Sequence, residues 1–237
     1  MQDLKGKVAY ITGGSKGIGY GVAEKLITAG MKVAISGRTL KKVENAAQYL
    51  GNSDQVLALE SDVTRLVDEK DAVSKILDKW GQLDVVLANA GVGHFAAVDE
   101  MSEDQWHQMM NTNLNGVFHT LKASVEALKK SKGYYITLAS LAGTNFFATG
   151  AGYNATKYGV VGFTQAAMLD LRKYDIKVST IMPGSVATYF NNHEPSEKDA
   201  WKIQPEDIGK LVLDLLKMHP RTLPSKIEVR PTRPDKK

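Results

Sequence analysis

Short apolar runs rich in β-branched residues alternate along the chain with longer segments in which apolar residues recur at helical spacing. The short runs predict seven strands, at residues 7–12, 32–36, 56–60, 83–89, 134–140, 177–182 and 226–230. The longer segments predict helical stretches at residues 17–30, 39–51, 65–81, 99–132, 151–175 and 205–219. Strands separated by crossover helices indicate a parallel sheet, and strands without a regular exchange of apolar and polar residues indicate that both faces are covered. We therefore expect an α/β fold, a doubly wound, seven-stranded parallel sheet with helices on both faces.

No linker, low-complexity segment or repeat interrupts this alternation, so residues 1–237 are expected to form a single domain. No apolar run approaches the roughly 20 residues that cross a bilayer, and the segment Met1–Lys7 does not resemble the start of a secretory signal. We expect no membrane partner and a cytoplasmic location. The absence of cysteine excludes disulfides, zinc thiolates, iron–sulfur clusters and thiol nucleophiles, and we expect no metal site.

The net charge of +4 comes mainly from the C-terminal tail. Residues 226–237 hold five basic and two acidic residues, which contribute +3 and leave +1 for the rest of the chain. A nucleic-acid-binding protein usually carries a basic stripe interleaved with exposed aromatic residues, and the body of the chain shows none. We therefore expect no nucleic-acid partner.

In an open parallel sheet, ligands bind beyond the carboxyl ends of the strands, so the residues that follow each strand are the candidates for function. The first strand runs into a glycine-rich turn, TGGSKGIG, at residues 12–19, and a helical stretch follows. Glycine allows a tight turn and lets backbone amides approach a pyrophosphate at the positive end of the helix. After the first strand of such a sheet, this turn predicts a nucleotide-binding site.

The end of the second strand bears on the kind of nucleotide. An acidic residue there typically holds the ribose 2′-hydroxyl of NAD, whereas an arginine accommodates the 2′-phosphate of NADP. Here Gly37 stands at that place, Arg38 follows it, and Lys16 lies in the glycine-rich turn. A guanidinium suits phosphate, so these residues favour NADP(H). The alternative is that Arg38 and Lys16 are two solvated surface cations.

The third and fourth strands are followed by polar residues with two alternative roles. Asp62, with Val63 beside it, can contact the base of a nucleotide, or Asp62 can cap the helix that follows. Asn89, at the start of the run Asn89-Ala90-Gly91, can contact the ligand or satisfy backbone groups of its own loop. At either position the two roles are compatible.

Ser140 ends the fifth predicted strand, and Tyr153 and Lys157 follow 13 and 17 positions later. In a helix, the four-residue spacing puts the tyrosine and the lysine on one face, about one turn apart. An ammonium beside a phenol favours the phenolate and lowers the tyrosine pKa from about 10. Such a tyrosine exchanges a proton with a carbonyl or an alcohol. An isolated tyrosine–lysine pair of this spacing is usually structural, so a catalytic role for this pair depends on the other motifs of the sequence.

The whole set resembles the short-chain dehydrogenase/reductase family over residues 4–190. The resemblance is carried, in order and spacing, by Thr12-Gly13-x-x-x-Gly17-x-Gly19, Asn89-Ala90-Gly91, Asn113, Ser140, Tyr153-x-x-x-Lys157 and Pro183-Gly184. Each piece alone is common, whereas their joint occurrence is highly specific. The resemblance implies a Rossmann-type fold, with dinucleotide binding and catalysis in one domain, and the missing acid at position 37 is similar to the NADP-preferring members.

The same resemblance implies a role for each catalytic residue. Tyr153 would be the general acid in carbonyl reduction and the base in alcohol oxidation, and Ser140 would hydrogen-bond the substrate oxygen. Lys157 would hold the nicotinamide ribose and lower the tyrosine pKa. Asn113 would complete a water-mediated proton relay with Lys157, unless it is a polar helix residue that bonds backbone.

The implied cofactor contacts follow the strand ends. The backbone from Ser15 to Ile18 would meet the pyrophosphate, Asp62 and Val63 the adenine, and the run from Asn89 the adenosine side. Residues after the sixth strand would lie near the nicotinamide. The full set of expected cofactor-binding residues is Gly13, Ser15, Lys16, Gly17, Ile18, Gly19, Arg38, Asp62, Val63, Asn89, Ala90, Gly91, Tyr153, Lys157, Pro183, Gly184 and Thr188.

We therefore expect an NADP(H)-dependent oxidoreductase that reversibly reduces a ketone or aldehyde, a small-molecule substrate, to an alcohol, and that forms a homodimer or homotetramer. Residues 185–204 are expected to form a short substrate lid. Substrate-facing positions are expected at Val92, His94 and Phe95, and Phe146, Phe147, Tyr189, Phe190 and Trp201 are expected to form an apolar wall or lid, unless they pack against the core or between subunits.

Two alternatives to this function stay open. The first is a 3-oxoacyl-[acyl-carrier-protein] reductase, in which Lys129, Lys130 and Lys132 would dock an acidic carrier; the same lysines suit a solvated helix end. The second is a non-catalytic NADP-binding regulator that keeps the fold.

Overall fold

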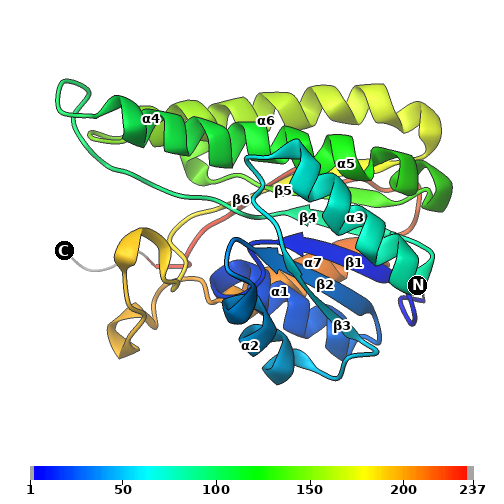
Figure 1. Ribbon diagram of the computed structural model, residues 1–237. Helices are drawn as coiled ribbons and strands as arrows, with labels where there is room; N and C mark the ends of the chain where they lie inside the picture. The colour runs from blue at the N-terminus through cyan, green and yellow to red at the C-terminus, as the bar shows by residue number, and fades with distance from the viewer. Residues whose placement is uncertain (1–2, 234–237) are drawn as a thin grey trace.

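The computed structural model describes residues 3–233 and contains the expected seven-stranded parallel sheet (Figure 1). Residues 1–2 and 234–237, the latter the end of the basic tail, lie outside the described residues. The strands are β1 (Val8–Thr12), β2 (Lys32–Gly37), β3 (Val56–Glu60), β4 (Val85–Ala88), β5 (Tyr134–Leu138), β6 (Lys177–Pro183) and β7 (Lys226–Val229). Their order across the sheet is β3-β2-β1-β4-β5-β6-β7. The order reverses between β1 and β4, which is the point at which doubly wound sheets bind ligands.

Helices cover both faces of the sheet, as expected, with α1, α2 and α7 on one face and α3, α5 and α6 on the other (Figure 1). The helices are α1 (Gly17–Thr28), α2 (Leu40–Leu50), α3 (Leu66–Trp80), α4 (Glu103–Met109), α5 (Gly116–Ser131), α6 (Ala151–Leu171) and α7 (Pro205–Lys217). Within residues 3–233, no helix is long and apolar enough to cross a membrane.

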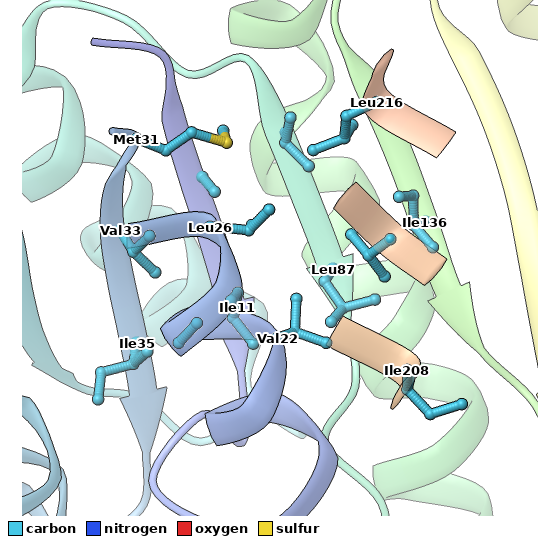
Figure 2. Packing of buried hydrophobic residues seen from close by; sticks show 14 of the residues in the cluster. Ile11, Val22, Leu26, Met31, Val33, Ile35, Leu87, Ile136, Ile208 and Leu216 are labelled. Atoms are coloured by element: carbon cyan, nitrogen blue, oxygen red, sulfur yellow. The ribbon is translucent and has the colours of Figure 1, made fainter. Parts of the chain in front are cut away.

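Two apolar cores, one on each side of the sheet, explain why the strands show no regular exchange of apolar and polar residues. Alternate residues of β1 enter different cores: Ile11 packs with α1 and α7, whereas Val8 packs with α3 and α5. Figure 2 shows the first core, to which Ile11 of β1, Leu26 of α1 and Ile208 of α7 all belong. Both faces of the central strands β1, β4 and β5 are therefore buried.

The helical stretch predicted at residues 99–132 is interrupted, so that prediction is wrong in detail. Its first helix begins only at Glu103, because the Ser102 hydroxyl accepts from the Gln105 backbone while the Gln105 side chain accepts from the Ser102 backbone. A π-helical turn, Met110–Asn115, then separates α4 from α5, and the Gly116 amide bonds the Asn111 carbonyl five residues back. Such turns often occur at functional sites, and this one contains Asn113.

A buried carboxylate links the middle of β1 to the loop after β3. Glu69 of α3 is fully buried, and its Oε1 accepts from the Tyr10 hydroxyl at 2.9 Å and from the Ser61 hydroxyl at 2.6 Å. The hydroxyls of Tyr10 and Ser36 are 3.0 Å apart. Burial raises the pKa of the Glu69 carboxyl, while the surrounding hydroxyls act in the opposite direction. Sequence patterns did not indicate this group.

Replacing Glu69 by alanine is expected to lower the free energy of unfolding by about 2–4 kcal/mol, because the hydroxyls of Tyr10 and Ser61 lose their acceptor and a cavity opens beneath α3. Urea unfolding of wild type and variant measures the difference. Glu44 lies exposed on α2, so Glu44→Ala is the matched control and should change stability by less than about 0.5 kcal/mol. Equal losses in the two variants would contradict this role of Glu69.

Candidate functional site

The glycine-rich turn after β1 leaves the start of α1 open to an anion. Gly13 and Gly17 have φ values of +65° and +57°, a region that favours glycine. Lys16 precedes the helix in an extended conformation, and among the described residues no side chain caps α1. A Cβ at Gly19 would lie 2.7 Å from the Gly13 carbonyl oxygen and from Asn89 Nδ2, so only glycine fits there. This bare backbone at a helix N-terminus fits a pyrophosphate.

The loops after β1 and β4 are joined by hydrogen bonds at the switch point of the sheet. The Thr12 hydroxyl accepts from the backbone N–H groups of Asn89 and Ala90 at 3.0 and 3.1 Å. Asn89 Nδ2 donates to the carbonyls of Thr12 and Gly13 at 2.8 and 3.1 Å. The loop-stabilising role of Asn89 is thereby confirmed, and its contact with a ligand stays a prediction.

A polar cavity of about 410 Å³ lies beyond the carboxyl ends of β2 and β3, where the adenosine end of a dinucleotide is expected. It is lined by Arg38, Glu60, Asp62, Arg65, Asp68, Asp71 and Lys75. Arg65 pairs with Asp68 at 3.5 Å. Lys16 points elsewhere, because its Nζ lies 5.8 Å from the ring centre of Tyr189. Of the two cations that the sequence singled out, Arg38 is the one on the cavity wall.

Asp62 lies on the wall of this cavity, and Val63 follows it in the chain. Asp62 does not cap α3, so that alternative is wrong: Arg65 precedes the helix, and Asp62 Oδ1 accepts from the Thr64 backbone at 3.0 Å in a local turn. Val63 is buried, and its carbonyl is bonded by His119 Nδ1 at 2.8 Å. Contact of Asp62 and Val63 with a base stays a prediction.

Tyr153 and Lys157 share one face of α6, beside the end of β5. Lys157 is buried, and its Nζ donates to the Leu138 carbonyl at 2.9 Å and lies 5.6 Å from the centre of the Tyr153 ring. The Ser140 hydroxyl accepts from the Ala142 backbone at 3.1 Å and lies 3.5 Å from the Pro183 carbonyl oxygen. The four-residue spacing thus brings the phenol and the ammonium together, as predicted.

The pKa of Tyr153 departs from expectation. Burial raises it to about 12, and the Ser140 hydroxyl acts in the opposite direction. Burial also lowers the pKa of Lys157, to about 8. The prediction of a lowered tyrosine pKa is therefore wrong for the free protein, because aromatic rings shield the phenol and the ammonium bonds the Leu138 carbonyl. Tyr153 is a protonated phenol at neutral pH.

Asn113 is buried in the π-helical turn and holds the loop after β4. Its Oδ1 accepts from the Val92 backbone at 2.8 Å, and its Nδ2 donates to the Val92 carbonyl at 2.8 Å and to the Thr156 hydroxyl at 3.2 Å. A Cβ at Gly91 would lie 3.3 Å from Asn113 Oδ1 and 3.9 Å from Lys157 Nζ, so the three residues meet. The backbone-bonding alternative is confirmed for the side chain, and the proton relay stays a prediction.

The low pKa of Lys157 predicts a pH-dependent contribution to stability. The group titrates at about 8 in the folded chain and near 10.5 in the unfolded chain, so between these values the unfolded chain binds more protons and the free energy of unfolding rises with pH. Lys157→Met removes this slope. The difference in free energy of unfolding, wild type minus variant, should therefore grow between pH 8 and pH 9.5 in urea titrations, whereas a constant difference would contradict the shift.

Aromatic residues from separate loops gather around Tyr153. Phe95 and Phe190 lie 5.5 and 5.6 Å from the tyrosine ring centre, and Phe147 lies 5.7 Å from Phe95. Phe146 is 88% exposed and does not join this cluster. Tyr189 and Trp201 lie in the expected lid segment, each beside a lysine, and their contact with a substrate stays a prediction. His94 bonds the side chain of Gln108 in α4 at 3.0 Å, and its contact with a substrate stays a prediction.

Residues 185–204 leave the layers of the sheet after β6 and return to α7 (Figure 1). The two ends of the segment pair through the Ala187 amide to the Ile203 carbonyl at 2.9 Å, and the segment closes around Asp199. Asp199 contacts His193 at 2.7 Å and Lys202 at 2.6 Å, and these contacts hold the pKa of its carboxyl well below the usual range. No local pattern in the sequence pointed to Asp199.

Asn154 is a second residue that the motifs did not single out, although it stands next to Tyr153. It is buried, and its Nδ2 donates to the carbonyls of Ala142 and Asn145 at 2.7 Å each. It therefore anchors the loop after β5 to the start of α6. The only signal in the sequence was its place between a catalytic candidate and small residues.

Known proteins resemble this chain over nearly its whole length. A family model described as short chain dehydrogenase matches residues 7–199. An uncharacterised oxidoreductase of Staphylococcus aureus (strain MRSA252) is 32% identical over 233 residues, which cover 98% of this chain and 100% of that protein. An alcohol dehydrogenase from the archaeon Thermococcus sibiricus, solved with 5-hydroxy-NADP, has a TM-score of 0.91 at 31% identity and covers 98% of this chain and 100% of its own. A 3-ketoacyl-(acyl-carrier-protein) reductase from Brucella melitensis, solved with NADH, has a TM-score of 0.89 at 26% identity and covers 97% of this chain and 99% of its own.

Proposed function

Because the chain belongs to the short-chain dehydrogenase family, we propose that it is an oxidoreductase that uses NADP(H) to reduce a ketone or aldehyde reversibly to an alcohol. In this proposal Tyr153 is the general acid in reduction and the general base in oxidation. One observation carries the proposal. The phenol of Tyr153, the ammonium of Lys157 and the hydroxyl of Ser140 converge at the same edge of the sheet as the open glycine-rich turn. A proton donor thus lies beside a dinucleotide cradle.

The preference for NADP(H) is supported by charge at the adenosine end. No acid occupies position 37, and Arg38 lines the cavity beyond β2. Of the two similar proteins with bound cofactors, one holds an NADP derivative and the other holds NADH. Family membership alone therefore does not determine whether NADP(H) or NAD(H) is preferred. Lys16 would add a second cation if its side chain left Tyr189 for the 2′-phosphate.

The chemistry divides between the cofactor and the protein. When bound, the nicotinamide supplies the hydride in reduction and accepts it in oxidation. Tyr153 donates its phenolic proton to the carbonyl oxygen, and the Ser140 hydroxyl donates a hydrogen bond to that oxygen. A pKa of about 12 keeps the phenol protonated at neutral pH, which suits reduction. The Lys157 ammonium lies close enough to stabilise the phenolate that results, and Asn113 holds the adjoining loop.

Residues 185–204 are proposed as the substrate lid within one domain that both binds the cofactor and performs catalysis. The segment is tied at its base and closed around Asp199, and it places Phe190 against Tyr153. Thr188 of the same segment lies against the glycine-rich turn, because a Cβ at Gly17 would be 3.4 Å from the threonine side chain. The lid therefore spans the proposed cofactor and substrate sites.

Assembly into a homodimer or homotetramer is proposed through α5 and α6. Phe118 of α5 and Tyr158 and Leu169 of α6 are 44–51% exposed, which is unusual for large apolar side chains on two neighbouring helices. Light scattering tests the assembly, and a monomer would contradict it. The cytoplasmic location expected from the sequence stays a prediction.

Initial rates with NADPH and NADH, measured against ketones, aldehydes and acetoacetyl thioesters, test the proposed function. NADPH oxidation that depends on a carbonyl substrate, with lower catalytic efficiency for NADH, is the expected result. Equal or better efficiency with NADH would contradict the cofactor preference. Binding of NADPH without turnover of any carbonyl compound would favour the non-catalytic regulator.

The carrier-linked alternative gains no support from its proposed docking lysines. Lys129, Lys130 and Lys132 lie at the end of α5, next to the start of β5, whereas Tyr153 lies beyond the opposite ends of the strands. Lys129 pairs with Glu126 at 2.7 Å and Lys132 with Asp175 at 2.8 Å. A carrier docked there would face the wrong edge of the sheet. A strong thioester preference in the rate measurements would revive this alternative.

A further inference from the structure

Three phenylalanine rings from three different loops form a cluster beside Tyr153, two of them against its ring and the third, Phe147, against Phe95. Phe95 follows β4, Phe147 follows β5 and Phe190 follows β6. Phe95 meets Phe147 at 5.7 Å, Tyr153 at 5.5 Å and Phe190 at 6.4 Å between ring centres, each with interplanar angles of 61–76°. Phe190 lies 5.6 Å from Tyr153. We call Phe95, Phe147 and Phe190 the phenylalanine box.

The backbone is shaped to admit these rings. A Cβ at Gly93 would lie 2.5 Å from Phe190 Cζ, and a Cβ at Gly150 would lie 2.6 Å from Phe147 Cε2. Both glycines therefore make room for an aromatic ring rather than for a turn. The Ala96 amide donates to the Thr149 carbonyl at 3.0 Å and joins the loops that carry Phe95 and Phe147. This hydrogen bond holds Phe95 and Phe147 in a fixed position relative to each other.

The box offers no charge to a substrate. In the part of the chain that the structure describes, no lysine or arginine lies over the ring of Phe95, Phe147 or Phe190. The ammonium of Lys157 faces the Tyr153 ring and bonds the Leu138 carbonyl. In the lid, Lys202 and His193 are engaged by Asp199. Phe95 and Phe147 are 39% and 47% exposed, so a bound substrate would cover them, and a carboxylate or phosphate placed against them would lose part of its hydration without gaining a counter-ion.

From this arrangement, and resting on the proposed function, we infer that the substrates are neutral carbonyl compounds with an aromatic ring attached to the carbonyl carbon. Aromatic rings favour edge-to-face contacts with centres 4.5–7 Å apart, the arrangement that the box already adopts among its own members. A planar aryl group next to the carbonyl can make the same contacts while its oxygen meets the phenol of Tyr153. Thioesters of a long polar carrier arm and keto acids lack this match.

A panel of matched aldehydes with NADPH tests the substrate class. Benzaldehyde is compared with cyclohexanecarbaldehyde, which lacks the aromatic ring, with 4-carboxybenzaldehyde, which adds a charge, and with an acetoacetyl thioester. We expect kcat/KM for benzaldehyde to exceed that for 4-carboxybenzaldehyde by at least about tenfold, because a desolvated charge finds no partner. Equal efficiency for these two aldehydes, or a preference for the thioester, would overturn the inference.

Binding measurements separate a failure of this inference from a failure of the proposed function. Calorimetry with the protein and NADP⁺ compares benzyl alcohol with 4-(hydroxymethyl)benzoate. If no aldehyde is turned over, the proposed function fails, yet tighter binding of benzyl alcohol still supports the aryl site. Equal binding of the two alcohols, or binding of neither, overturns the aryl site whether or not turnover occurs.

Adjacent phenylalanines provide a matched pair of variants. Phe147 belongs to the box, whereas Phe146 is 88% exposed and contacts none of its rings. Phe147→Leu is expected to lower the ratio of kcat/KM for benzaldehyde over cyclohexanecarbaldehyde by about threefold to tenfold, since the edge-to-face contact is lost while an apolar wall remains. Phe146→Leu should leave the ratio unchanged. A Phe147→Leu variant that loses activity toward both aldehydes equally would show a merely structural role and contradict the inference.

Discussion

Replacing Tyr153 by phenylalanine is expected to lower turnover by at least about 10³-fold, while the dissociation constant for NADPH stays within about threefold of wild type. The change removes only the phenolic oxygen. The ring keeps its edge-to-face contact with Phe95 and its place beside Lys157, so the shape of the site is retained. What is lost is the proton that the carbonyl oxygen needs in reduction.

Tyr158 is the matched control for this substitution. It lies on the same helix, five residues after Tyr153, and is 44% exposed. Tyr158→Phe should keep wild-type turnover, which shows that loss of a phenol from α6 is not itself damaging. Steady-state rates and fluorescence titration with NADPH give the two quantities. A Tyr153→Phe variant that keeps a tenth or more of wild-type turnover would contradict the assignment of Tyr153 as the proton donor.

Replacing Arg38 by aspartate is expected to reverse the cofactor preference. Arg38 lines the cavity beyond β2 and β3, where a 2′-phosphate would find its guanidinium and where a ribose 2′-hydroxyl would find the new carboxylate. Loss of a charge-assisted contact, together with repulsion of the phosphate, should lower kcat/KM for NADPH by about 100-fold. The kcat/KM of the variant for NADH should equal or exceed that of wild type.

The control for Arg38 changes charge far from this cavity. Arg172 is exposed in the turn after α6, at the end of the molecule opposite the glycine-rich turn, and Arg172→Asp should leave both cofactor efficiencies within about twofold. Rates measured with each nicotinamide cofactor at fixed ionic strength give the ratio. If Arg38→Asp lowers NADPH and NADH efficiencies equally, the residue supports the loop and does not select the phosphate.

The elements of the sheet, and the place of the candidate site residues on them, could be predicted from the sequence because both depend on local pattern. The run of β-branched residues that ends at Thr12, followed at once by four glycines within seven positions, determines a strand, a turn and a helix start without reference to distant residues. The spacing of Tyr153 and Lys157 likewise determines that both lie on one face of α6. Parallel pairing then brings the strand ends to one edge.

What could not be predicted depends on distant contacts. Residues 99–132 have continuous helical periodicity, yet Asn113 is turned inward by a π-helical turn whose partners, Val92 and Thr156, are 21 and 43 positions away. The pKa of Tyr153 rises rather than falls because its surroundings, which include Phe95 and Phe190 from two other loops, partly shield the phenol from water. The spacing of residues along a helix does not predict burial by residues from distant loops.

The most direct test of the central claim follows the hydride from the cofactor to the product, with and without the phenol of Tyr153. Wild-type protein and Tyr153→Phe are each incubated with NADPH deuterated at the transferable position and with benzaldehyde and acetoacetyl thioester in turn, and the alcohol products are analysed by mass spectrometry. The predicted result is an alcohol that carries one deuterium on the former carbonyl carbon with wild type, and none above background with Tyr153→Phe. Wild-type protein that binds NADPH but yields no deuterated alcohol from either substrate, or a Tyr153→Phe variant that yields as much as wild type, would contradict it.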